Sequence, residues 1–204
     1  MADQKISALT AASAAAAADE FAINEATTSK KLTVAQLVEW IPISKTAYSA
    51  QTADITISSL TGNTDLAYKI MVEGKLVPSP GGDYNVTVRP NGDTTAGNYI
   101  NSRHYSDGSA HAVDNPAGAG LVLCNNVWSG NTSVIGEMIF SAKDRDVARP
   151  YNCHWSAIRL AGGTNSYMLT SGGYWSNTAD EVTSLVINLS SDAFTGTIAV
   201  FKKA

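Results

Sequence analysis

The sequence predicts a mainly β protein, in which a short N-terminal anchor segment precedes an antiparallel β-sandwich of the jelly-roll type. Three observations predict it. From about residue 54 onward, apolar and polar residues alternate with a period of two, as in strands that bury one face. Clusters of Gly, Pro, Asn, Asp and Ser separate the alternating runs and mark turns. No long helical stripe interrupts them, which argues against a parallel α/β sheet.

The alternation locates the strands. The run at 66–73 places Leu66, Tyr68, Ile70 and Val72 on one face and Lys69, Met71 and Glu73 on the other. We expect further strands at residues 54–58, 84–89, 99–105, 121–128, 134–141, 152–160, 167–170, 182–189 and 196–202. About nine or ten short strands with this punctuation fit two packed antiparallel sheets.

The first fifty residues follow a different pattern. Residues 11–18 are almost all alanine, which favours helix, but a helix this short is marginal in water on its own. Residues 20–23 and 31–34 predict two short strands around a Thr/Ser turn. Residues 34–40 predict a brief amphipathic helix that ends before a proline.

These patterns divide the chain into an attachment segment at 1–42, a linker at 43–53 and a sandwich domain at 54–204. The attachment segment has too few large apolar residues to fold alone, because domains below about 40 residues usually need staples or partners. We therefore expect a partner surface to order it. The predicted anchor contacts are Ile6, Leu9, Phe21, Ile23, Leu32, Val34, Leu37 and Trp40.

Composition excludes several classes of function. Of 204 residues, 44% are hydrophobic and only 16% are charged, which indicates a polar but uncharged surface. The net charge is −4 and no run of Lys or Arg exceeds a pair, so the chain lacks the clustered cations of a nucleic-acid-binding protein. No apolar stretch approaches the about 20 residues that cross a bilayer. The N-terminus lacks the charge pattern of a signal peptide, so we expect synthesis in a cytoplasm.

Residues with reactive side chains do not form a catalytic or metal-binding pattern. Cys124 and Cys153 are expected to be reduced, buried thiols. Cys153 and His154 are neighbours on a predicted strand, so their side chains point to opposite faces and cannot share a proton. His104 and His111 show no metal-ligand spacing with His154. We expect no enzyme activity, no metal and no cofactor.

The sequence gives weaker support to two other kinds of site, a calcium site and a glycosidase active site. Asp144 and Asp146 favour a mixed-charge loop over a calcium site, since such a site needs six to eight oxygen ligands. A glycosidase would need two carboxylates across one cleft, and the predicted strands offer few such pairs.

Aromatic residues are the best candidates for ligand binding. They cluster with Asn, Ser and Gly in the middle and late part of the chain, at Tyr99, Tyr105, Trp128, Tyr151, Trp155, Tyr174 and Trp175. One interpretation is packing in the sandwich core or between subunits. The other is an exposed sugar-binding surface, because aromatic faces cover the apolar side of a sugar. The predicted ligand-surface residues are Tyr174, Trp175, Tyr151 and Tyr105, with Tyr174 and Trp175 as the first choice.

Short motifs at both ends of the chain resemble those of tailed-bacteriophage virion proteins. Ile6-Ser-Ala-Leu-Thr10, the pair Asp19-Glu20 and the run Lys30-Lys-Leu-Thr-Val-Ala-Gln-Leu37 resemble the N-terminal attachment segment of many phage fibre and spike proteins. Four later stretches, ITISSLTGN, YKIMVEG, VRPNGDTTAGNY and FTGTIAVFK, resemble a jelly-roll domain common in phage particles. Pro90 stands where that pattern has an aromatic residue.

The resemblance implies a virion structural protein, made in the cytoplasm of the host bacterium and located in the virion. It implies a homotrimer that is anchored by its N-terminus to other virion proteins, either the capsid or a portal or tail adaptor. The short chain favours a capsid-bound head fibre or decoration protein. The alternative is a short tail fibre or collar appendage that binds a host-surface glycan. Neither role involves nucleic acid or insertion into a membrane.

Overall fold

The computed structural model describes residues 20–25, 28–33, 39–77, 84–106, 111–115, 118–127, 132–143, 146–159, 165–189 and 193–203. The chain divides into two units, Met1–Ile41 and Pro42–Ala204. Each unit has its own internal contacts, and we describe each by itself.

The first unit contains an antiparallel hairpin of β1 (Glu20–Glu25) and β2 (Thr28–Thr33). Phe21 is opposite Leu32, and Ile23 is opposite Lys30. This confirms the two strands that the sequence predicts here. The alanine-rich stretch at 11–18 and most of the predicted helix, residues 34–38, lie outside the described residues.

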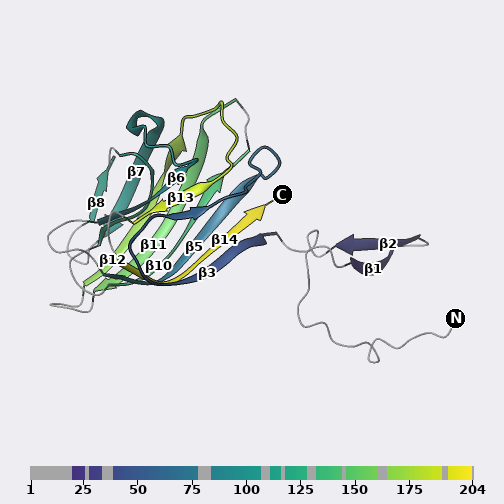
Figure 1. Ribbon diagram of the computed structural model, residues 1–204, viewed down its shortest axis with the longest axis horizontal. Helices are drawn as coiled ribbons and strands as arrows, with labels where there is room; N and C mark the ends of the chain where they lie inside the picture. The colour runs from purple at the N-terminus through teal and green to yellow at the C-terminus, as the bar shows by residue number, and fades with distance from the viewer. Residues whose placement is uncertain are drawn as a thin grey trace. The chain divides into compact units, whose positions relative to one another are not determined.

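The second unit is an antiparallel β-sandwich (Figure 1), which confirms the main prediction of fold class. Its larger sheet has eight strands in the order β3-β14-β5-β10-β11-β12-β7-β8. Their bounds are β3 (Ile41–Gln51), β5 (Ala67–Val77), β7 (Tyr99–Ser106), β8 (His111–Asp114), β10 (Thr132–Ser141), β11 (Arg149–Arg159), β12 (Asn165–Trp175) and β14 (Ala193–Lys203).

The smaller sheet has four strands in the order β4-β13-β6-β9 and covers one face of the larger sheet. Its strands are β4 (Ile55–Ile57), β6 (Tyr84–Pro90), β9 (Leu121–Val127) and β13 (Leu185–Asn188). A single turn of 3-10 helix, η2 (Ala96–Asn98), precedes β7. Each of the ten strands that the sequence predicts after residue 53 is present, with shifted ends.

The core lies between the two sheets and follows the predicted alternation. On β5, Tyr68, Ile70 and Val72 are buried. The smaller sheet contributes buried side chains such as Leu185 and Ile187 on β13. Burying such side chains contributes about 1.5–3 kcal/mol each, so the sandwich has a core that can support it without the first unit.

The linker predicted at 43–53 is wrong for most of its length, because residues 41–51 form β3, an edge strand beside β14. The Ala50 N–H donates to Thr195 Oγ1 over 2.9 Å. The Tyr48 and Phe194 rings lie 6.2 Å apart. An edge strand pairs with only one neighbouring strand, and many of its side chains are partly exposed. The residues of an edge strand therefore do not need a strong apolar alternation. The short strand β8 was also not predicted, for the same reason.

The turn predicted at Asn91-Gly92 is confirmed. Both residues have positive φ, 53° and 66°, and the Asp93 N–H donates to the Pro90 carbonyl over 3.0 Å. This is the geometry that Asn-Gly favours. The buried Pro90 ends β6 at this point, and the turn after it is intact.

Candidate functional site

The four predicted ligand-surface residues do not form one exposed cluster. Trp175 is fully buried, so the prediction that it is exposed is wrong. Its Nε1–H donates to Asp93 Oδ2 over 2.8 Å, and the Arg149 guanidinium lies 5.1 Å from its ring centre. Its neighbour Tyr174 is 39% exposed. Successive residues of a strand point to opposite faces, so these two side chains cannot share a surface.

Tyr151 is a core residue, and Tyr105 packs against the core with only part of its side chain exposed. Tyr151 is buried, and its hydroxyl donates to Asn101 Oδ1 over 2.6 Å. Tyr105 is half-buried and stacks on Tyr167, with ring centres 5.8 Å apart. For Tyr151 and Trp175 the core-packing interpretation holds, while Tyr174 is exposed and Tyr105, half-buried, also lines a hollow on the outer face of the larger sheet.

The predicted anchor residues are only partly described. Phe21 and Ile23 lie on β1, Leu32 lies on β2, and Trp40 is a half-buried residue directly before β3. The remaining predicted contacts, Ile6, Leu9, Val34 and Leu37, lie outside the described residues.

Both cysteine side chains are buried and not in a disulfide, as predicted. Cys153 Sγ donates to the Leu123 carbonyl over 3.2 Å, while His154 on the next position is exposed on the opposite face. Burial raises the pKa of the Cys153 thiol to about 12. The thiol therefore stays protonated and cannot act as a nucleophile with His154.

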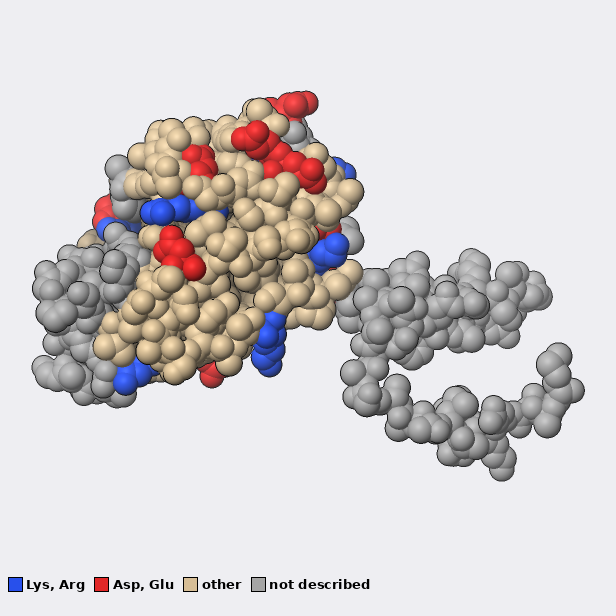
Figure 2. Space-filling model, viewed as in Figure 1, with Lys and Arg blue, Asp and Glu red and all other residues tan. Residues whose placement is uncertain are grey.

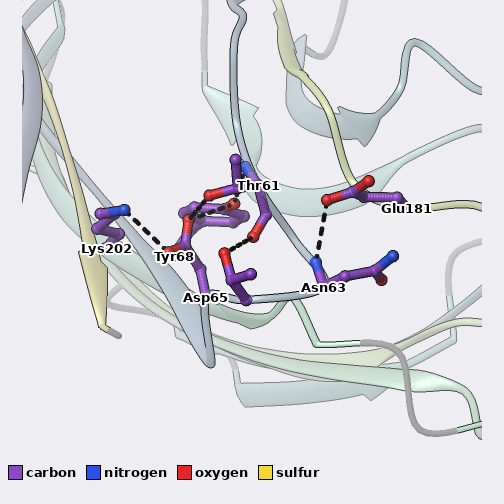
Figure 3. Close-up of polar contacts among 7 residues, drawn as sticks. Thr61, Asn63, Asp65, Tyr68, Glu181 and Lys202 are labelled. Atoms are coloured by element: carbon purple, nitrogen blue, oxygen red, sulfur yellow. Dashed lines mark hydrogen bonds and ion pairs between the residues drawn. The ribbon is translucent and has the colours of Figure 1, made fainter.

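A polar network at one end of the sandwich is structural (Figure 3). The buried carboxylate of Asp65 accepts hydrogen bonds from Thr61 Oγ1 (3.0 Å) and from the Tyr68 hydroxyl (2.9 Å). It also pairs with Lys202 Nζ on the last strand at 3.0 Å. Burial and the neighbouring Asp65 raise the pKa of Tyr68 above its ordinary value. Donors from the protein surround this carboxylate, so the network ties the C-terminal strand to the loop before β5.

The outer face of the larger sheet, the face turned away from the smaller sheet, is a candidate binding surface. Large apolar side chains are exposed there: Met71, Val77, Ile100, Val113, Ile135, Ile158, Met168 and Tyr174. Exposed apolar groups gathered on one face mark binding surfaces more often than scattered ones do.

Three adjoining hollows cross this face, and we call them together the outer groove. Their volumes are about 480, 370 and 220 Å³. The first and second hollows share Met168 and Thr170, and the second and third share Met71 and Ile135. The groove thus runs across the strands from β8 toward β14.

Polar side chains stand in register along this groove. His104 on β7 is opposite Thr170 on β12, which is opposite His154 on β11, which is opposite Glu137 on β10. We call these four residues the polar row. Thr170 Oγ1 and His154 Nδ1 lie 3.5 Å apart. The strand order and register of the larger sheet make these four residues neighbours on one face.

Apolar residues border the polar row. Val113 and Met71 are opposite its two ends, in the same register. Met168 lies two residues before Thr170 on β12, and Ile135 lies two residues before Glu137 on β10, both on the same outer face. Their side chains are 63% and 59% exposed. A groove with hydrogen-bonding groups along one line and apolar groups beside it can hold a ligand with one polar and one apolar side.

Charge is sparse around the groove. Among the described residues that line it, the charged ones are Lys45, Glu73 and Glu137. Figure 2 shows most of the visible surface as uncharged, with Lys and Arg separated from one another and acidic side chains gathered near the top of the view. The described lining of the groove therefore contains no cluster of cations.

No group of three or more His, Cys, Asp or Glu in the described part of the chain has a geometry that could hold a metal ion. Thr170 separates His104 from His154 within the polar row. None of the residues that the structure describes belongs to a helix with the length and apolar character of a membrane span.

Comparison with known proteins gave no match to a family model, to a curated protein or to a solved structure.

Proposed function

We propose that this protein is a non-enzymatic structural component of a tailed-phage virion. Residues 1–42 attach the chain to the capsid, and the sandwich is displayed on the particle as a short head fibre or decoration. The resemblance of the Ile6–Thr10 and Lys30–Leu37 motifs to phage attachment segments suggests this role. The proposal includes the jelly-roll character of the sandwich and a location in the virion after synthesis in the host cytoplasm.

The observation that carries the proposal is the contrast between the two units. The described strands of Met1–Ile41 form a lone two-stranded hairpin. An isolated hairpin of this kind is marginally stable at best in water, whereas a sheet with a packed face is stable. The hairpin therefore gains most from a foreign surface, and the sandwich needs none.

A trimer strengthens such an attachment. Three copies held together present three weak contacts, and the second and third contacts form at a high effective concentration. The resemblance to phage virion proteins implies a homotrimer, and we propose that number of copies. Light scattering on the full chain tests the number of copies.

A truncated chain tests the attachment role. A chain that starts at the predicted domain boundary, residue 54, would lack β3. A chain that starts at Glu39 keeps β3. We expect this chain to fold with the melting midpoint of the sandwich and to be missing from particles assembled in its presence. Full incorporation of this chain would contradict the proposal.

A matched pair of substitutions in the full chain separates attachment from folding. Leu32→Asp replaces a predicted anchor contact on β2, and Ser29→Asp adds the same charge on the same strand. We expect Leu32→Asp to reduce incorporation strongly and Ser29→Asp to leave it near the wild-type level. Equal incorporation of the two variants would remove Leu32 from the anchor.

The outer groove favours a second role. A displayed domain with an open groove can bind a host-surface glycan, as a short tail fibre or collar appendage would. This alternative keeps the same N-terminal anchor and differs in the position on the particle. Imaging of intact particles distinguishes the two positions.

A further inference from the structure

We infer that the outer groove binds a linear, uncharged glycan that lies across the strands of the larger sheet. In this arrangement successive sugars lie over β7, β12, β11 and β10. The inference goes beyond the attachment role and uses different residues, so each can fail without the other.

The spacing of the polar row fits a chain of sugars. Neighbouring strands lie about 4.8 Å apart, so the row offers one hydrogen-bonding side chain at each such step. This step is close to the length of one pyranose unit in an extended chain. His104, Thr170 and His154 occupy three consecutive steps in direct register.

The chemistry of the row suits hydroxyl groups. A threonine hydroxyl donates and accepts, a neutral imidazole has one donor and one acceptor, and a carboxylate accepts. Sugar hydroxyls can complement each of these groups. The exposed side chains of Thr170 and His154 are available for such contacts in the described chain.

The apolar border suits the other side of a sugar. A pyranose has a face of C–H groups, and covering that face with an apolar side chain removes both from water. Met168 touches two of the three hollows and is 63% exposed, so it lies where adjacent sugars would meet. Ile135 has the same position on β10, and Val113 lies at the β8 end.

The charged side chains that line the groove favour an uncharged glycan. A uronate or a sulfated sugar is normally held by Arg or Lys, and Lys45, beyond the end of the polar row, is the cation among the described lining residues. Glu137 within the row would repel an anion. Hexoses and N-acetylhexosamines therefore fit better than acidic sugars.

The test is binding of the full chain to an array of linear oligosaccharides of increasing length, both uncharged and uronate-containing, followed by calorimetry on the strongest ligand. We expect binding to uncharged chains, with affinity rising up to about four sugars, one for each strand of the polar row. Thr170→Ala should weaken binding by about twofold to tenfold, the loss of one hydrogen bond.

Met168→Arg places a long charged side chain in the groove and should abolish binding. Met168 is exposed, so the variant should keep the wild-type melting midpoint. Thr56→Ala, on the exposed side of β4 in the smaller sheet, is the matched control for Thr170→Ala and should bind as wild type.

Three results would overturn the inference: no uncharged oligosaccharide binds, only acidic chains bind, or Met168→Arg binds as well as wild type. Light scattering adds a fourth. If Met168→Arg lowers the number of chains in the assembly, this face is an interface between copies and the glycan site is rejected. Particle incorporation is measured separately, so loss of the glycan result leaves the attachment role standing.

Discussion

Asp93 organises the point where the chain passes from the smaller sheet to the larger one. It follows β6 and precedes β7. Its carboxylate accepts hydrogen bonds from the Thr95 N–H (2.8 Å), from Asn98 Nδ2 (2.7 Å) and from Trp175 Nε1 (2.8 Å). Burial alone would raise the pKa of Asp93, but the hydrogen bonds from Asn98, Trp175 and Thr95 outweigh it and lower the pKa below its ordinary value.

This lowered pKa predicts a dependence of stability on pH. An unfolded Asp has a pKa of about 3.9, and the folded pKa is lower, so the carboxylate stabilises the fold above about pH 4. That stabilisation is lost as the pH falls through the folded pKa. We expect Asp93→Asn to lower the free energy of unfolding at neutral pH and to approach wild type in acid. Denaturant unfolding at both pH values measures the difference.

Glu73 on β5 provides the comparison for this prediction, because it is an exposed carboxylate. The difference between Glu73→Gln and wild type should stay small at both pH values. A wild-type advantage over Asp93→Asn that persists unchanged in acid would show that the ionised carboxylate is not the cause.

At the scale of elements, β5 and β14 approach each other through a pair of glycines. Gly74 is directly opposite Gly196, on the side of the sheet that faces the core. A Cβ atom on Gly74 would lie 2.4 Å from the Thr195 carbonyl oxygen and 2.7 Å from Gly196 Cα. Both contacts are with backbone, so a side chain could fit only if the strands moved apart.

We therefore expect Gly74→Ala to destabilise the sandwich by about 1–3 kcal/mol, the usual cost of overpacking a core. Gly97→Ala in η2 is the matched control, because a Cβ there meets nothing within 4 Å. Its stability should equal or slightly exceed wild type. Chemical denaturation compares the two variants. Equal midpoints would contradict the close approach of β5 and β14.

The same two strands show why some elements could be predicted and others could not. The period-two pattern of β5 and β14 follows from burial of one face, which any sequence with that pattern must satisfy. Strand β3 has Lys45, Thr46 and Ala47 in succession and has no such pattern. β3 forms because its backbone pairs with the edge of β14. That partner is more than 140 residues away in the sequence, so the local pattern at 41–51 does not reveal the strand.

At the scale of the whole molecule, the two units differ in the stability expected of them. The hairpin of β1 and β2 has two strands, and the sandwich has twelve strands around one core. Local opening is easiest where few buried contacts oppose it. Binding of the hairpin to a partner would reduce this difference in stability, because a partner stabilises the state to which it binds.

Limited trypsin digestion tests this difference. We expect the first cleavage of the free chain after Lys30 or Lys31 on β2, well before cleavage at Lys69 on β5. Mass spectrometry of the fragments identifies the sites. On assembled particles, the cleavage at Lys30 and Lys31 should slow. Simultaneous cleavage at Lys69 and Lys31 in the free chain would mean that the units have equal stability.

Local patterns in the sequence were enough to predict the antiparallel sandwich, the hairpin, the Asn91-Gly92 turn and the opposite directions of Cys153 and His154. These features depend on local rules of alternation and turn chemistry, so neighbouring residues suffice to predict them. Three features became visible only in the folded chain: Trp175 is buried against Asp93, β3 forms one edge of the larger sheet, and the four residues of the polar row are neighbours. Each of these depends on which distant strands become neighbours, and strand order is a property of the whole chain.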